Sequence, residues 1–288
     1  MRVARDWEDY ELIDAGDKEK LERWGTLVLR RPDPQALWPR GADARWNRPD
    51  AWYHRSNDGG GSWKCLPNIP KAWTVSYRNL VFRIERMGFK HTGLFPEQAV
   101  NWDWMREKIS AVSTPVRVLN LFAYTGGATV AAASAGAEVC HVDASKGMNE
   151  RAKENLGLSG LEKAPVRFIT DDAIKFVERE KRRGRAYDAV ILDPPSFGRG
   201  PKGEVWKVEE QIFSLLERAV DVLSDRSLFV LVNSYTTGLS PRVIHNMLAL
   251  TVGKKFGGTS SSFELGLAAT GRENIILPCG SSARWERA

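Results

Sequence analysis

The chain has 288 residues, a formal net charge of +6 and a pI near 9.2, and this length allows one large or two modest domains with a substantial core. No apolar run is long enough to span a bilayer, the first residues lack the apolar segment of a signal peptide, and neither the three cysteines nor the four histidines form a ligand-like pair. These features argue against a membrane protein, a disulfide framework and a metal site, and they predict a soluble protein of the cytoplasm.

The first part of the chain is rich in tryptophan and in short β-type runs. WGTLVLRRPDP, WYHRSNDGGGSW, KAWTVSY and LVFRIERMG are separated by Pro, Asn, Asp and Gly turns. The segment Asp58-Gly59-Gly60-Gly61 is predicted to be the loop of a hairpin between two tryptophan-bearing strands. Residues 1–86 are therefore predicted to form a small, mainly antiparallel β-domain.

Arginines interleave with these aromatic residues, at positions Arg30, Arg31, Arg40, Arg45, Arg48 and Arg55. Such a mixture suits stacking and backbone contacts with single-stranded nucleic acid, so the domain is a candidate for recognition of RNA or substrate. The alternative is that the tryptophans are the core of a small β-domain. The net charge allows a polyanionic partner without requiring one.

Strands and helices alternate from Asn101 onward. The predicted helices are 102–112, 128–136, 146–158, 172–183, 209–223 and 241–252, and the predicted strands are 116–122, 137–143, 166–170, 187–193, 227–234, 261–267 and 274–280. This alternation predicts a doubly wound, mostly parallel seven-stranded α/β sheet over residues 87–288, with helices on both faces. The last two strands are expected to add an antiparallel edge.

A nucleotide-binding pattern occupies the first of these units. The apolar run VLNLF is followed by the tight turn Tyr124-Thr125-Gly126-Gly127 and a helix of small residues, and Asp143 ends the next strand. A doubly wound fold places a carboxylate there to accept from ribose hydroxyls. The turn lacks the G-x-G-x-x-G spacing of NAD and FAD sites, so a different nucleotide cofactor is indicated.

A second motif, Asp193-Pro194-Pro195-Ser196-Phe197, closes the fourth apolar strand of the α/β part. Two prolines give a stiff loop without backbone donors of its own, which fixes the carboxylate and the proline carbonyls at the edge of the sheet. With an aromatic ring beside it, such a loop suits a flat, amine-bearing substrate. The alternative is a rigid strand exit without a catalytic role.

The ordered set of motifs resembles the class I S-adenosylmethionine-dependent methyltransferases. Together with the segment KHTGLFPEQ at residues 90–98, it is similar to the large-subunit ribosomal RNA methyltransferases of the cytosine-C5 and guanine-N7 type, over roughly residues 75 to 280. The resemblance implies an enzyme that binds S-adenosylmethionine and methylates ribosomal RNA.

The resemblance also implies roles for particular residues. Lys90, Phe95 and Gln98 would fold over the cofactor, and Asp143 would hold its ribose. Asp171 or Asp172 would accept from the adenine amine, unless these carboxylates cap the following helix. Asp193, with the carbonyls of Pro194 and Pro195, would orient the acceptor, and Phe197 would stack on an extruded base. Asp193 is also predicted to contact the cofactor, and the remaining predicted cofactor contacts are Phe122, Tyr124, Thr125, Gly126, Gly127, Ala144 and Ser145.

The absence of a cysteine at one position narrows the choice of acceptor atom. Cytosine-C5 relatives place a cysteine near Ser234, and a serine hydroxyl is hardly ionised at neutral pH. Cys140 lies inside an apolar strand and is predicted to be core. A nitrogen target in RNA is therefore predicted, with methylation of a protein side chain or small planar metabolite, or an RNA-binding protein without catalysis, as alternatives.

Overall fold

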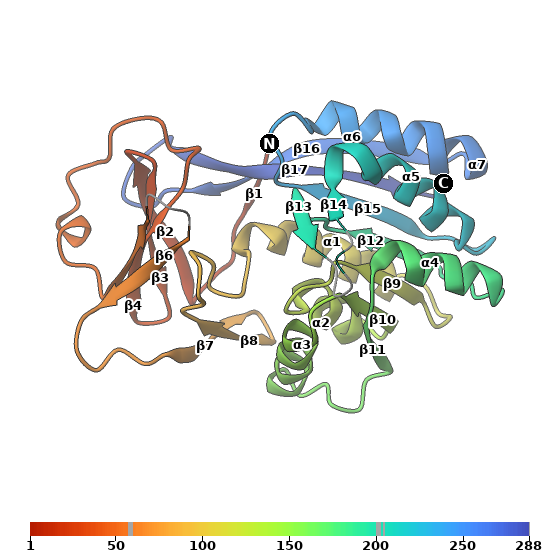
Figure 1. The fold of residues 1–288 in the computed structure, drawn as a ribbon, viewed down its shortest axis with the longest axis horizontal. Coiled ribbons are helices and arrows are strands. Elements are labelled where there is room, and N and C mark those ends of the chain that lie inside the picture. Colours follow the sequence, from red (N-terminus) through yellow and green to blue (C-terminus); the bar gives the residue numbers. More distant parts are fainter. Residues whose placement is uncertain (57–59, 200–202, 204, 288) are drawn as a thin grey trace. The chain divides into compact units, whose positions relative to one another are not determined.

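The structure is a computed structural model that describes residues 1–56, 60–199, 203 and 205–287. Contacts divide the chain into two compact units. The first unit contains Asn101–Leu265 and Gly280–Ala288, with Met1, and the second contains Arg2–Val100 and Gly266–Cys279. The second unit therefore continues past residue 86, and it includes the part of the terminal hairpin around its turn. Figure 1 shows the two units in the colours of the sequence.

The main sheet has the strand order β1-β16-β17-β15-β12-β9-β10-β11. Its strands are β1 (Arg2–Ala4), β9 (Arg117–Leu121), β10 (Glu138–Asp143), β11 (Val166–Thr170), β12 (Ala189–Leu192), β15 (Phe229–Ser234), β16 (Thr259–Ala268) and β17 (Ile276–Glu286). Strands β15, β12, β9, β10 and β11 are parallel, and β17 pairs antiparallel to β15. The predicted doubly wound sheet with an antiparallel edge is confirmed, and the short β1 is an eighth strand beside the seven predicted.

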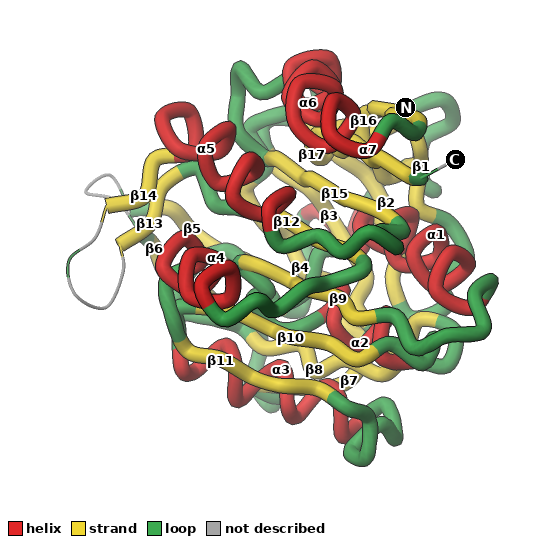
Figure 2. The backbone as a smooth tube through the Cα atoms, turned by 90° about the vertical axis from the view of Figure 1, so that its right-hand side faces the viewer, coloured by secondary structure: helices red, strands yellow, loops and turns green. Residues whose placement is uncertain are grey.

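Helices cover both faces of this sheet, as Figure 2 shows for α4 and α5 in front and α2 and α3 behind. They are α1 (Ala99–Ser110), α2 (Gly127–Ser134), α3 (Lys146–Leu158), α4 (Ala173–Arg182), α5 (Val208–Asp221), α6 (Pro241–Leu248) and α7 (Lys254–Phe256), with a π-helical stretch, Ala249–Gly253, after α6. Successive strand residues point to opposite faces. Leu119 and Leu121 of β9 accordingly share a core with α4 and α5, whereas Asn120 between them donates to Thr129 of α2.

The strand order reverses at β9, because the chain proceeds to β10 and β11 on one side and to β12 and β15 on the other. In such sheets ligands bind outside the carboxyl ends of the strands at this switch point. Leu121 is in register with both Val142 and Leu192. The residues that follow, Phe122, Asp143 and Asp193, therefore leave adjacent strands at the same edge.

The second unit is mainly antiparallel β-structure, as predicted. It has a five-stranded sheet, β2 (Tyr10–Gly16), β3 (Glu19–Trp24), β4 (Leu27–Pro32), β5 (Ala51–Arg55) and β6 (Gly61–Cys65), and a two-stranded sheet, β7 (Ala72–Tyr77) and β8 (Leu80–Glu85). Two short 3-10 helices, Ala44–Trp46 and Pro96–Gln98, lie between or after these strands. β5 and β6 form the predicted hairpin, although Asp58 and Gly59 of its loop lie outside the described residues. Strands β2 and β3 were not predicted.

A buried ion-pair cluster explains why those two strands escape pattern analysis. Glu22 of β3 is fully buried and accepts from Tyr10 Oη at 2.9 Å and from Arg31 Nε at 2.7 Å. Burial alone would raise its pKa, but the charges of Arg31 and Lys20 lower the pKa of Glu22 to about 2. Charged residues therefore occupy buried positions of these strands, where an apolar residue would have produced the alternating pattern that identifies a strand.

The interleaved arginines of this unit are largely engaged with carboxylates. Arg30 lies 2.6 Å from Glu19, Arg40 lies 3.7 Å from Asp17 and Arg45 lies 2.7 Å from Asp43. Trp24 and Trp46 are buried, and the indoles of Trp38, Trp63 and Trp73 donate to backbone carbonyls. These contacts favour the structural interpretation of the aromatic residues, and RNA recognition by this unit stays a prediction.

Candidate active site

The turn after β9 is built on backbone that few residues adopt. Phe122 and Tyr124 have φ of 55° and 51°, and Gly126 has φ of 83°. For residues other than glycine this left-handed conformation costs about 1–3 kcal/mol and clusters at functional sites. A Cβ on Gly126 would lie 2.8 Å from the Cβ of Ala152. Only glycine at position 126 therefore allows this close contact with α3. The contact is a second reason for a glycine here, beside the predicted close approach to a cofactor.

Asp143 at the end of β10 is fixed by the turn it faces. Its Oδ2 accepts from the backbone N–H of Tyr124 and its Oδ1 from that of Ser145, both at 2.8 Å. The side chain is half-buried, and burial raises its pKa although the two N–H bonds oppose this. Ser145 is the N-cap of α3, so Asp143 is held in place without serving as the helix cap. Ala144 and Ser145 are exposed beside it.

Beneath this edge lies a polar chain that the sequence analysis did not identify. Asn120 Nδ2 donates to Thr129 Oγ1 at 3.0 Å, and Thr129 Oγ1 lies 2.8 Å from His141 Nδ1. All three side chains are buried, and burial lowers the pKa of His141 to about 4, so the ring is neutral at pH 7. The signal was present in the sequence as polar residues inside the apolar runs VRVLNLF and AEVCHVD.

Asn149 joins the ends of two neighbouring strands. Its side-chain amide donates to the carbonyl of Asp143 at 3.3 Å and to Thr170 Oγ1 at 2.7 Å. The peptide N–H of Asp171 donates to the same carbonyl at 3.2 Å. The segments that follow β10 and β11 are therefore tied together.

Asp171 and Asp172 both have structural partners. Asp172 is the N-cap of α4 and accepts from the N–H of Lys175 at 2.9 Å. Asp171 forms an ion pair with Arg179. The capping alternative therefore describes Asp172 in this structure, and the contact of either carboxylate with adenine stays a prediction.

The D-P-P loop leaves β12 beside the turn. Asp193 is half-buried, Pro194 is buried and Phe197 is 54% exposed. The carbonyl of Pro195 accepts from the indole N–H of Trp206 at 2.7 Å. Of the two carbonyls predicted to face an acceptor, that of Pro195 is thus engaged within the protein. Contact of the Asp193 carboxylate and the Pro194 carbonyl with an acceptor stays a prediction.

Ser234 ends β15 and is buried, with its Oγ accepting from the N–H of Thr236 at 3.1 Å. Cys140 is buried in the core of the sheet as predicted, and burial raises the pKa of its thiol. Cys65 and Cys279 belong to the second unit. Within the described part of the first unit, no cysteine follows β15.

Lys90, Phe95 and Gln98 all lie in the second unit. Lys90 Nζ lies 3.4 Å from the carbonyl of Pro32, and Gln98 is buried in the short helix Pro96–Gln98. The rings of His91 and Phe95 pack edge to face at 5.5 Å. Their predicted contact with a cofactor stays a prediction.

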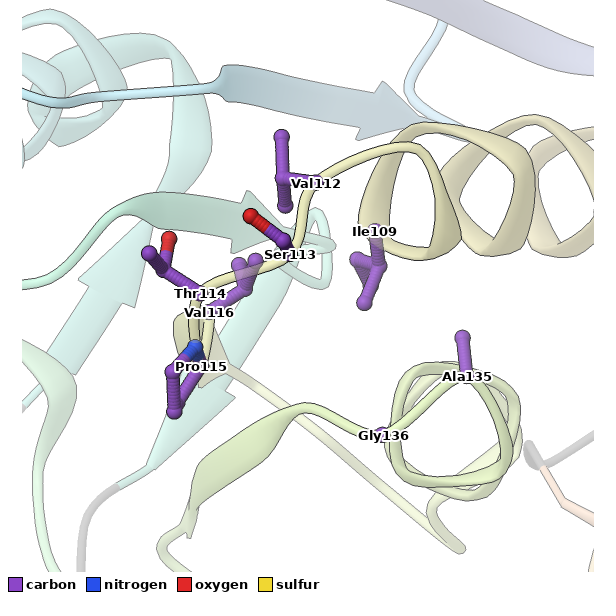
Figure 3. A pocket seen from close by; sticks show the side chains of 8 residues that line it. All are labelled: Ile109, Val112, Ser113, Thr114, Pro115, Val116, Ala135 and Gly136. Atoms are coloured by element: carbon purple, nitrogen blue, oxygen red, sulfur yellow. The ribbon is translucent and has the colours of Figure 1, made fainter.

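A shallow cavity of about 240 Å³ lies at the other edge of the sheet (Figure 3). Its lining is apolar or uncharged: Ile109, Val112, Ser113, Thr114, Pro115, Val116, Ala135 and Gly136. These residues precede β9 or follow α2, whereas Asp143 is the last residue of β10 and Asp193 is the first residue after β12. None of the eight lining residues has a titratable side chain.

Comparison with known proteins assigns the chain to a family. A family model for S-adenosylmethionine-dependent methyltransferases matches residues 46–238. The chain belongs to this family. The crystal structure of the SAM-dependent methyltransferase from Agrobacterium tumefaciens is 38% identical, covers 99% of this chain and 93% of its own, and superimposes with a TM-score of 0.94.

Curated relatives match a shorter part of this methyltransferase. The ribosomal RNA large subunit methyltransferase I of Aeromonas salmonicida is 37% identical over 39% of the chain, and the K/L enzyme of Shewanella frigidimarina is 32% identical over 53%. The matches cover 27% and 21% of those relatives, so the chain spans only about a quarter of their length.

The residues at the sheet edge fit S-adenosylmethionine, the cofactor of the family. The Asp143 carboxylate is anchored by two backbone N–H groups and remains half-exposed, which leaves oxygen lone pairs for the hydroxyls of a ribose. In the described residues no cluster of three His, Cys, Asp or Glu side chains is arranged to hold a metal ion. No described helix is long and apolar enough to cross a membrane.

Proposed function

We propose that this methyltransferase methylates a nucleobase nitrogen in RNA, with ribosomal RNA as the substrate. The observation that carries the proposal is the D-P-P loop, which leaves β12 next to the β9 turn, with Asp143 at the end of β10 on the other side of that turn, and presents the exposed ring of Phe197. A flat base stacked on this ring would bring an amine to Asp193 and Pro194.

The chain supplies position more than proton chemistry. When bound, S-adenosylmethionine provides the electrophilic methyl group. Asp143 would hold the ribose, and Asp193 with the carbonyl of Pro194 would accept hydrogen bonds from the N–H groups of the acceptor amine, which directs the nitrogen lone pair toward the methyl carbon. The methylated nitrogen then releases one proton to solvent. Such alignment converts a bimolecular reaction into a unimolecular one, and most of the rate enhancement can come from it.

A nitrogen acceptor agrees with the residue that ends β15. Carbon-5 of cytosine becomes nucleophilic only after a thiolate adds to C6, and here Ser234 is buried with its hydroxyl engaged by Thr236. A nitrogen lone pair needs no covalent activation. The site therefore suits the simpler reaction.

Ribosomal RNA is supported by the relatives, whose names identify them as large-subunit ribosomal RNA methyltransferases, and by the net charge of +6. Such a substrate would place the protein in the cytoplasm. The test is mass mapping of modified nucleosides in ribosomal RNA from cells with the protein, without it, and with only Asp193→Ala. We expect one N-methylated nucleoside that is present only with the parent protein.

Two outcomes would replace the proposal. Unchanged RNA together with a newly methylated protein or metabolite would assign another substrate class, and RNA affinity that does not fall with salt would point the same way. If the protein bound RNA but showed no affinity for S-adenosylmethionine in calorimetry, it would be an RNA-binding module without catalysis.

A further inference from the structure

The D-P-P loop cannot hold itself in place. Pro194 and Pro195 have no N–H to donate, so this part of the loop depends on its carbonyls and on neighbouring residues. Before the prolines, the N–H of Asp193 donates to the carbonyl of Leu121 at 3.5 Å. Ser196 contributes two bonds: its carbonyl accepts from the N–H of Val208 at 3.1 Å, and its Oγ lies 2.6 Å from Thr236 Oγ1. The carbonyl of Pro195 accepts a third bond, from the indole N–H of Trp206 at 2.7 Å.

Trp206 reaches this carbonyl from a ribbon that folds back on the loop. β13 (Phe197–Arg199) pairs antiparallel to β14 (Val205–Lys207), with Trp206 opposite Gly198. Neighbouring positions of a strand point to opposite faces. Phe197 and Val205 are accordingly exposed, whereas Trp206 is 7% exposed and packs in the core of the sheet.

The same indole contacts the cofactor turn. The rings of Trp206 and Phe122 lie 4.9 Å apart at 50°, and Phe122 is one of the turn residues with a positive φ. A residue in such a conformation persists only where its surroundings hold it there. Trp206 therefore contacts Phe122 in the turn after β9, which is predicted to bind the methyl donor, and Pro195 in the D-P-P loop, which is proposed to bind the acceptor.

We infer that Trp206 is a positioning residue of this methyltransferase, which holds the acceptor loop at a set distance from the cofactor turn. The inference rests on the proposed role of the D-P-P loop. Because in-line transfer is sensitive to displacements of about 1 Å, loss of the indole N–H should reduce turnover while cofactor affinity is retained.

The chain offers a matched control in Trp285. Its indole donates to the carbonyl of Gly257 at 2.6 Å, its ring neighbours Phe256 at 6.2 Å, and it is fully buried in the same core. Trp206→Phe and Trp285→Phe each remove one buried indole N–H bonded to a carbonyl. They differ in whether that carbonyl belongs to the acceptor loop.

Two measurements are made on both variants after thermal melting shows that they fold. Hydrogen exchange of the Ser196, Phe197 and Gly198 amides should be faster in Trp206→Phe than in the parent and unchanged in Trp285→Phe. Steady-state methylation of RNA should show kcat lowered about tenfold in Trp206→Phe alone, with the Kd for S-adenosylmethionine within about twofold of the parent. If the phenylalanine variant does not fold, Trp206→Tyr takes its place.

Equal exchange, or equal turnover, in the two variants would overturn the inference. A parent protein that methylates no RNA would instead overturn the proposed function. In that case hydrogen exchange alone decides whether Trp206 anchors the loop, because that measurement needs neither substrate nor activity.

Discussion

Asp143 illustrates how much a single carboxylate depends on its surroundings. Its oxygens accept from the N–H groups of Tyr124 and Ser145, so its orientation is set before any ligand arrives. Asp143→Ala should remove both acceptors for the ribose hydroxyls. Hydrogen bonds to a charged group contribute roughly 1.5 to 3 kcal/mol each, and affinity should fall at least about 100-fold.

Calorimetry with S-adenosylmethionine measures this loss, and Asp188→Ala is the control. Asp188 also accepts from a backbone N–H, that of Arg117 at 2.9 Å, but it lies before β12, at the opposite edge of the sheet. Parent-like affinity in a folded Asp143→Ala protein would remove Asp143 from the site.

The raised pKa of Asp143 predicts a pH dependence of cofactor binding. Burial disfavours the charged form, so protonation begins above the ordinary value of 3.8 as pH falls. The protonated carboxyl is a weaker acceptor, and the Kd should rise with acidification in the parent but much less in Asp143→Asn. For stability the sign is opposite: the ionised group costs free energy near neutral pH, and this cost disappears as pH falls through the raised pKa. Calorimetric titrations from neutral pH downward test this prediction. It would be contradicted if the Kd changed with pH in the same way in the parent and in Asp143→Asn.

Asp193 should affect a different kinetic constant. Its proposed partner is the acceptor amine, so Asp193→Ala should lower kcat about 100-fold or more while the Kd for S-adenosylmethionine stays near that of the parent.

Phe197→Ala should mainly raise the apparent KM for RNA, because base stacking contributes roughly 1 to 3 kcal/mol. Steady-state kinetics on both variants provide the test, and parent-like rates in both would make the loop purely structural.

At the scale of elements, the second unit is held together by charges inside a sheet. Strands β2, β3 and β4 meet at Tyr10, Glu22 and Arg31. The depressed pKa of Glu22, about 2 against an ordinary 4.5, means that its pairing stabilises the unit above pH 4.5. That stabilisation is lost as pH falls through about 2.

The loss can be measured by comparing unfolding of the parent and of Glu22→Gln in denaturant at several pH values. A shift of this size corresponds to about 3 kcal/mol. The free-energy difference between the two proteins should therefore narrow by about that amount between pH 4.5 and 2. A difference that is independent of pH would mean that Glu22 is not charged in the folded unit.

In the first unit a polar cluster joins a helix to the sheet. Asn101 of α1 accepts from Nε of Arg284 in β17 at 3.0 Å and donates to Asn233 of β15 at 3.1 Å. The Arg284 guanidinium is buried and lies 4.4 Å from the ring centroid of Trp104, an attractive arrangement for a cation. These contacts fix α1 against the antiparallel edge of the sheet.

The chemistry of the whole molecule depends on where all three cysteines lie. A C5 enzyme forms a covalent adduct with cytosine, and 5-fluorocytidine in RNA would trap it because the fluorine blocks release after methyl transfer. Cys140 is in the core, Cys65 and Cys279 belong to the second unit, and Ser234 ends β15, so we expect no trapped species on denaturing gels. An adduct abolished by replacing any one cysteine with serine would make the protein a C5 enzyme with a relocated nucleophile.

The sequence by itself determined the order of strands and helices in the first unit, because the apolar periods of buried strands and helices are local and the turn, Asp143 and D-P-P motifs are contiguous with them. It also placed Asp143 and Asp193 at one edge, since parallel strands end together. The sequence left two roles open for Asp172, capping of α4 and contact with adenine, because a carboxylate that precedes a helix has the same spacing in either role.

Only the tertiary structure decided which groups complete the site and the second unit. The bond from Trp206 to Pro195 joins strand β14 to the loop that follows β12, and no spacing rule indicates it. Strands β2 and β3 were missed because Glu22 is buried against Arg31, a partner nine positions beyond it in the sequence. A charge neutralised by a distant charge occupies an interior position without the apolar signal on which pattern analysis depends.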